Sequence, residues 1–169
     1  MKISSNTLGL AAEFAVASEL CRRDIYAQLT LGHLKRTDLL ILNEETSRML
    51  RVEVKSKQGK DWPNCKGIYG DNAVLVFVDF AGKGEFDRPD FYILTVEDWI
   101  EYANKEIANH PKKRIKLDER NVPIWLDQIN RSGQPYKGMG VTADKIQQHR
   151  EKWGKVIQMV GRVEANRAI

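Results

Sequence analysis

The sequence of 169 residues has too few cysteines and too short apolar runs for several classes of protein. Its two cysteines, Cys21 and Cys65, are too few for a disulfide framework or a cysteine-ligated zinc site. No run approaches the ~18–20 consecutive apolar residues of a membrane-spanning helix. Glu13 interrupts the apolar stretch near the N-terminus that a signal peptide would need. We therefore expect a cytoplasmic protein with reduced cysteines and no membrane partner.

Several enzyme motifs are missing as well. The sequence contains no glycine-rich P-loop, no GxGxxG and no HExxH. Its histidines, His33, His110 and His149, stand without partners at the spacing of a nucleophile–base pair or a metal site. Chemistry based on a serine, cysteine or histidine nucleophile therefore has no candidate here.

Charge is distributed unevenly along the chain. The net charge is +4, but residues 1–104 carry 13 Lys and Arg against 16 Asp and Glu, whereas residues 105–169 carry 14 against 7. The first part is thus at −3 and the second at +7. A strongly basic segment favours a polyanionic partner. A charged surface that only keeps the chain in solution is the alternative interpretation.

Hydrophobic periodicity predicts an α/β fold with a central mixed sheet flanked by helices. The predicted strands are 25–32, 38–43, 49–57, 73–80 and 91–96. Residues 49–57 alternate between apolar and polar, residues 73–80 are a near-continuous apolar run that predicts burial on both faces, and the linker between 38–43 and 49–57 is short enough for an antiparallel hairpin. Helices are predicted over 6–24, from Asp98 and after Thr142. Asn6 or Thr7 is expected to cap the first helix, whose apolar stripe runs through Leu10, Phe14, Ala17 and Cys21. Residues 58–72 are predicted to be a long loop and 110–141 to be irregular. We expect a core over 1–104 and a basic, mostly helical C-terminal segment over 105–169, packed on the same domain.

Acidic residues occupy unusual positions in this pattern. Asp38 opens an otherwise apolar strand, Glu53 and Lys55 share one face of the next strand about 6.6 Å apart, and Glu13 projects from a small, apolar helix stripe. Carboxylates in such surroundings are usually paired or bind a metal ion. Asp38 and Glu53, with the backbone carbonyl of Val54, would suit Mg²⁺, for which Mn²⁺ should substitute.

Lys55 would have a catalytic role beside such an ion. Its ammonium could orient a metal-activated water and stabilise the charge that develops on phosphorus during phosphodiester hydrolysis. The alternatives are a surface ion pair between Glu53 and Lys55, a turn role for Asp38, and pairing of Glu13 with Arg36 or Lys35.

Together these residues resemble the PD-(D/E)XK nuclease superfamily, which includes many restriction endonucleases and the archaeal Holliday-junction resolvases. Asp38 is followed after fourteen residues by Glu53-Val54-Lys55, the only acid-x-Lys triplet in the chain. Thr37 stands at the position of the motif's proline. The resemblance covers roughly residues 8–96. It implies that Asp38 and Glu53 are metal ligands, that Lys55 is the catalytic lysine and that Glu13 is the assisting helix acid.

Candidate contacts to nucleic acid lie outside this motif. Gln58 follows Lys55 by three residues, and the loop 57–70 mixes cations with aromatic residues, as contacts to nucleic acid often do. The candidates are Gln58, Lys57, Lys60, Trp62, Lys66 and Tyr69 in or next to this loop, and Lys112, Lys113, Arg114, Arg131 and Lys137 in the basic segment. Trp62 could instead fold back on the core.

The sequence therefore predicts a metal-dependent endonuclease that acts on DNA. RNA remains an alternative substrate. A homodimer is possible, because one active site cuts one strand. The competing hypotheses are a nucleic-acid-binding protein without turnover and a protein-interaction module on the same scaffold.

Overall fold

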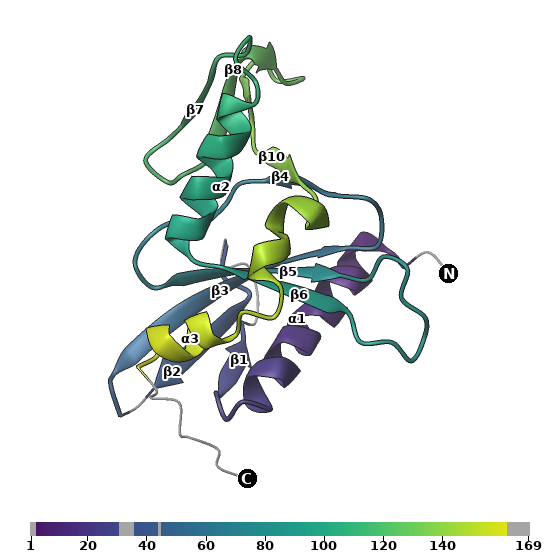
Figure 1. The fold of residues 1–169 in the computed structure, drawn as a ribbon, viewed down its shortest axis with the longest axis vertical. Helices are drawn as coiled ribbons and strands as arrows, with labels where there is room; N and C mark the ends of the chain where they lie inside the picture. The colour runs from purple at the N-terminus through teal and green to yellow at the C-terminus, as the bar shows by residue number, and fades with distance from the viewer. Residues whose placement is uncertain (1–2, 31–35, 44, 162–169) are drawn as a thin grey trace.

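The computed structural model describes residues 3–30, 36–43 and 45–161, and its centre is a mixed five-stranded sheet (Figure 1). In spatial order the strands are β1 (Ala27–Leu29), β2 (Leu39–Asn43), β3 (Arg48–Lys57), β5 (Ala73–Asp79) and β6 (Asp90–Leu94). Only β3 and β5 run parallel, and the other neighbours are antiparallel. The predicted α/β class and mixed sheet are confirmed. No helix in the described ranges is both long and apolar enough to cross a membrane.

Strand β5 separates two hydrophobic cores, because all of its residues are buried. Val74, Val76 and Val78 belong to one core, whereas Leu75 and Phe77 belong to the other. One face of the sheet is covered by α1 (Ser5–Cys21) and α3 (Gly154–Met159), and the other by α2 (Val96–Ala108), β4 (Trp62–Cys65), β10 (Met139–Val141) and the 3-10 helix η1 (Ala143–His149). The predicted fully buried strand at 73–80 is thus confirmed.

Helix α1 is capped two or three residues earlier than predicted. Ser4, not Asn6 or Thr7, is the N-cap residue, and its side chain accepts a hydrogen bond from the backbone of Thr7. The apolar stripe expected through Leu10 and Phe14 is also wrong, since these side chains are 50% and 58% exposed. The buried residues of this helix are Leu8, Ala12, Val16, Ala17, Glu19 and Leu20.

The segment after α2 departs most from the prediction. Residues 110–141, expected to be irregular within a mostly helical segment, form three strands of a second sheet and the strand β10, which pairs with β4. The second sheet consists of β7 (Ile115–Leu117), β8 (Pro123–Ile129) and β9 (Pro135–Lys137). β7 and β9 have only three residues each, too few to show a periodicity, and the seven residues of β8 do not alternate between apolar and polar.

The predicted final helix is likewise divided in two. Between η1 and α3 the chain is extended at Arg150 and adopts a positive φ of 56° at Glu151. The predicted loop 58–72 also contains a strand, β4. In both places a long-range contact sets the backbone: Arg150 bridges to Tyr92 of β6, and β4 pairs with β10.

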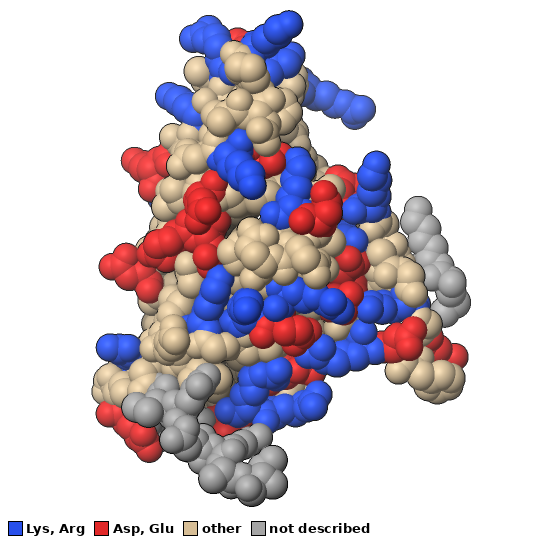
Figure 2. Space-filling model, in the orientation of Figure 1, with Lys and Arg blue, Asp and Glu red and all other residues tan. Residues whose placement is uncertain are grey.

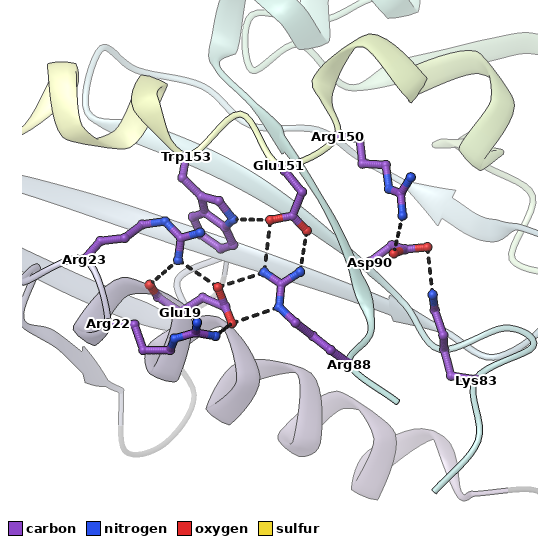
Figure 3. A network of polar contacts seen from close by, with 9 residues as sticks. All are labelled: Glu19, Arg22, Arg23, Lys83, Arg88, Asp90, Arg150, Glu151 and Trp153. Atoms are coloured by element: carbon purple, nitrogen blue, oxygen red, sulfur yellow. Dashed lines mark hydrogen bonds and ion pairs between the residues drawn. The ribbon is translucent and has the colours of Figure 1, made fainter. Parts of the chain in front are cut away.

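A buried carboxylate, Glu19, joins α1 to the loop before β6. The sequence pattern predicts a solvated face for Glu19, but this residue is 5% exposed. Its oxygens lie 2.7–3.0 Å from guanidinium nitrogens of Arg22, Arg23 and Arg88. Figure 3 shows that Arg88 also reaches Glu151, so the network crosses from α1 to the segment before α3. Hydrogen bonds from Arg88, with further ones from Arg23, lower the pKa of Glu19 to about 2 despite its burial.

We expect Glu19→Gln to lower the free energy of unfolding by about 3 kcal/mol at pH 7, since each pKa unit corresponds to about 1.4 kcal/mol. A depressed folded-state pKa stabilises the protein above the ordinary value of 4.5, and this contribution is lost as the pH falls toward about 2. Urea unfolding of the wild type and the variant should therefore converge between pH 4.5 and 2. Glu119→Gln, at an exposed acid, is the control. A stability difference that stays constant down to pH 3 would contradict this account.

Candidate functional site

The pairing of β2 with β3 brings Asp38 beside Glu53. Leu39 pairs with Val52 in antiparallel register, so the residue before Leu39 faces the residue after Val52. Two hydrogen bonds fix this end of the pair: the Asp38 amide donates to the Val52 carbonyl (2.8 Å), and the Val54 amide donates to Asp38 Oδ2 (2.6 Å). Asp38 and Glu53 therefore lie opposite each other on the antiparallel neighbours that the hairpin-sized linker predicted.

Glu53 is buried, and only one of its two carboxylate oxygens has a partner. It is 3% exposed, and its Oε1 lies 2.8 Å from Lys55 Nζ. Its Oε2 is buried without a hydrogen-bond partner, and it is the only side-chain oxygen or nitrogen of the described residues in that state. An unpartnered buried carboxylate oxygen carries a desolvation cost, so it marks a place where a cation or water is needed.

Lys55 and Glu13 belong to the same electrostatic environment. Burial acts to lower the pKa of Lys55, but the paired Glu53 and the nearby Asp38 outweigh it and the net shift is upward. The pKa of Glu13 is raised by burial and by the negative charge of Asp38, while Lys55 opposes that rise. Glu13 is half-buried on α1 and interacts with Asp38 and Lys55 through their charges, without a hydrogen bond among the described contacts.

A cavity of about 680 Å³ lies beside this site. Asp38, Glu53 and Lys55 form one part of its wall. The remaining lining residues are Arg36, Asn64, Lys66, Tyr69, Asp118, Arg120, Val122 and Lys137. Five cations, including Lys55, thus surround a small acidic centre, which is the charge pattern expected for binding an anion next to a metal ion. Glu13, Val54 and Gln58 are not among the lining residues.

The residues present fit a Mg²⁺ ion with few protein ligands. Oε2 of Glu53 has no partner, and Asp38 uses only Oδ2 as an acceptor within the described chain. No three side chains of the types His, Cys, Asp and Glu converge as a metal-binding group in residues 3–30, 36–43 and 45–161. Mg²⁺ usually binds through one or two carboxylates, with waters and substrate phosphate as its other ligands. A two-carboxylate site therefore suits it better than a metal that needs a complete protein cage.

Two predicted contacts to nucleic acid are wrong. Lys57 and Trp62 are only 6% and 1% exposed. The Lys57 ammonium lies 2.7 Å from Asp79 Oδ2 and 4.7 Å from the centre of the Trp62 ring. The two side chains therefore stabilise the interior, and the alternative that Trp62 folds back on the core is correct.

The other predicted contacts remain on the surface or near it. Gln58 is half-buried and tied to the N-terminal segment, because it exchanges two hydrogen bonds with the backbone of Ile3. Lys60 is exposed. Lys112, Lys113 and Arg114 are exposed just before β7. Figure 2 shows Lys and Arg side chains on both sides of the upper end of the molecule, where Figure 1 labels β8.

The three-stranded unit supplies site residues that the sequence pattern does not single out. Arg120, in the turn between β7 and β8, lines the cavity although it lies 67 residues after Glu53 in the sequence. Arg36 lines it from the segment before β2. Lys66 and Tyr69 are predicted from the sequence only as members of the mixed loop 57–70, and Lys137 only as one cation of the basic segment. Positive charge is the signal that the sequence offers for these residues. Their proximity to Asp38 and Glu53 depends on strands that the sequence pattern does not predict.

Known proteins similar to this chain are found among solved structures. The sequence matches no known family model and none of the curated proteins. Among solved structures, the bacterial homing endonuclease I-Ssp6803I is similar with a TM-score of 0.47 and 17% sequence identity, over 92% of this chain and 93% of that chain. At this level of similarity the comparison assigns no role to any residue and no activity to this chain.

The loop that carries Lys66 and Tyr69 depends on Gly67. Gly67 has a φ of +66°, and a Cβ placed there would lie 1.8 Å from the Trp99 ring. We expect Gly67→Ala to lower the free energy of unfolding by about 2–4 kcal/mol, from left-handed backbone strain and overpacking. Gly59→Ala is the matched control, because a Cβ at Gly59 would have nothing within 4 Å. Chemical denaturation measures both, and equal stabilities of the two variants would refute this role of Gly67.

Proposed function

We propose that the protein is a Mg²⁺-dependent nuclease of the PD-(D/E)XK type that hydrolyses phosphodiester bonds in DNA. The observation that carries this proposal is the arrangement of Asp38, Glu53 and Lys55 in one cavity with cationic walls, where Glu53 Oε2 has no partner. An acidic centre inside a basic cavity has the charge distribution that a phosphodiester and its metal ion require together.

Each residue has a separate role in this proposal. Asp38 and Glu53 would hold Mg²⁺, or Mn²⁺ in its place, with the Val54 backbone carbonyl as a further ligand. When bound, the ion lowers the pKa of water and neutralises charge on the phosphate. Lys55, whose ammonium already lies 2.8 Å from Glu53, orients the attacking water and stabilises the charge on phosphorus. The water oxygen bonds to phosphorus and gives up a proton to solvent, one ester P–O bond breaks, and the departing oxygen takes up a proton from solvent.

Glu13 and the surface cations would support this reaction. Glu13 adds negative charge near Asp38 from a different element, which favours a cation between them. Lys60, Gln58 and the cations Lys112, Lys113 and Arg114 would contact the DNA backbone, which fixes position but not sequence. RNA is the alternative substrate, and a homodimer would supply one site for each strand of a duplex.

The direct test is cleavage of plasmid, single-stranded and branched DNA, and of an RNA of the same sequence, in Mg²⁺, Mn²⁺ or EDTA. We expect metal-dependent cleavage that falls at least about 100-fold in both Asp38→Asn and Lys55→Ala, since each removes a group that acts on the transition state. The exposed residues Glu85 and Lys105 provide the matched controls Glu85→Gln and Lys105→Ala, which should keep wild-type activity.

The other outcomes separate the competing hypotheses. Cleavage that persists in both site variants would mean that another site or a contaminant acts. Salt-dependent binding without cleavage in any metal would instead support a nucleic-acid-binding protein on the same scaffold. If neither cleavage nor binding is found, a protein-interaction module is favoured. Thermal unfolding of each variant verifies that it is folded.

A further inference from the structure

We propose that Arg36, Arg51 and Arg120, gathered around Tyr69, form an arginine clamp that holds a second phosphate group of the nucleic-acid strand being cut. This inference rests on the proposed function for its substrate. It goes further by assigning a separate phosphate subsite to residues outside the Asp38–Glu53–Lys55 motif.

The three guanidinium groups surround one aromatic ring. The Cζ atoms of Arg36, Arg51 and Arg120 lie 5.7, 5.3 and 5.5 Å from the centre of the Tyr69 ring. All three distances fall within the range in which a cation is attracted to the ring quadrupole. Since the three arginines come from before β2, from β3 and from the β7–β8 turn, tertiary structure assembles the clamp.

The clamp has more positive charge than its surroundings neutralise. Within the described ranges none of the three arginines forms an ion pair with a carboxylate, although ten other lysine and arginine side chains do. Arg36 donates to the Lys66 carbonyl (2.9 Å) and Arg51 to the Tyr69 carbonyl (2.8 Å). A guanidinium has five N–H donors, so most of them remain available. Three neighbouring cations repel one another, and a bound phosphate would relieve that repulsion through bidentate hydrogen bonds.

The backbone of the turn that carries Arg120 is held in place before any ligand binds. The Asp118 carboxylate accepts hydrogen bonds from the amides of Arg120 and Val122, both at 2.9 Å. Asn121 then ties this turn to its neighbours, because its side chain donates to the Ile68 carbonyl (3.1 Å) and its own carbonyl accepts from Trp99 Nε1 (2.8 Å). A preorganised turn loses less entropy on binding, as a specific subsite requires.

The clamp lies close to the proposed cleavage site. Arg51 precedes Glu53 by two residues on the same face of β3, a step of about 6.6 Å, and Lys55 is one such step further. Arg36 likewise precedes Asp38 by two residues, and the cavity is lined by Arg36 and Arg120 together with Asp38 and Glu53. Each strand of a duplex carries one phosphate per about 3.4 Å of axis. The second phosphate should therefore lie within about four nucleotides of the bond that is cut.

Binding measured in EDTA tests the clamp independently of catalysis. We expect Arg120→Ala to weaken the binding of a short DNA about tenfold at low salt and to reduce the salt slope of log K by about one. Lys105→Ala, an exposed cation away from the cavity, should change neither quantity. Arg120 is itself exposed, so its variant should fold, and an unchanged affinity and slope would overturn the clamp.

Neutral methylphosphonate linkages identify which phosphate is held. With one neutral linkage moved along the strand, wild type and Arg120→Ala should become equal in affinity at one position only, within four nucleotides of the cut. A matched pair of DNAs with and without a 5′-phosphate tests a terminal phosphate as the source. Equality only on removal of the terminal phosphate would assign the clamp to a strand end. An Arg120→Ala effect that no single phosphate removes would overturn the proposal.

Failure of the clamp and failure of the nuclease are distinguishable. If cleavage is metal-dependent but Arg120→Ala binds like the wild type, the nuclease proposal stands and the clamp is wrong. If no metal supports cleavage but the methylphosphonate effect occurs at one position, the clamp stands and catalysis is wrong.

Discussion

The antiparallel register between β2 and β3 is the constraint on which the candidate site depends. A shift of one residue would turn Asp38 or Glu53 to the opposite face of the sheet, because side chains alternate along a strand. The register is held by the pairing of Leu39 with Val52 and by the hydrogen bond from the Val54 amide to Asp38 Oδ2. Burial of Leu39 and Val52 in the core beneath α1 makes any slip costly. The same packing that stabilises the sheet therefore sets the separation of the two carboxylates.

Burial of Glu53 gives the site its chemical character. A carboxylate that is 3% exposed needs positive charge, and Lys55 supplies it to one oxygen only. The second oxygen has no partner, and Glu53 lines a cavity whose other walls carry cations, so a divalent ion at the carboxylates and a phosphate against the walls would satisfy both sets of charges. The loop that carries Lys66 and Tyr69 and the second sheet (β7, β8 and β9) complete those walls. The basic C-terminal part of the chain thus contributes directly to the cavity that contains the acidic residues of the first part.

The order of apolar and polar residues was sufficient to predict the central strands of the sheet. The alternation in β3 and the continuous apolar run of β5 predicted both strands, and the length of the linker predicted that β2 and β3 would be antiparallel neighbours. Contacts made only after folding could not be predicted: Trp62 is buried against β5, and Arg120 reaches the cavity from a half-exposed unit whose strands show no alternation. The buried face of α1 was also misjudged, because small and large apolar residues occur around much of its circumference, and only packing against the sheet selects one face.

The central claim is that Asp38 and Glu53 bind a divalent cation, and anomalous diffraction from a crystal soaked in Mn²⁺ tests it most directly. We predict one strong anomalous peak between the two carboxylates, with oxygens of both Asp38 and Glu53 at about 2.1 Å from the ion. The peak should disappear in a crystal of Asp38→Asn that is soaked in the same way. An ordered Asp38–Glu53 pair with no peak at millimolar Mn²⁺, or with its only peak elsewhere, would contradict the account.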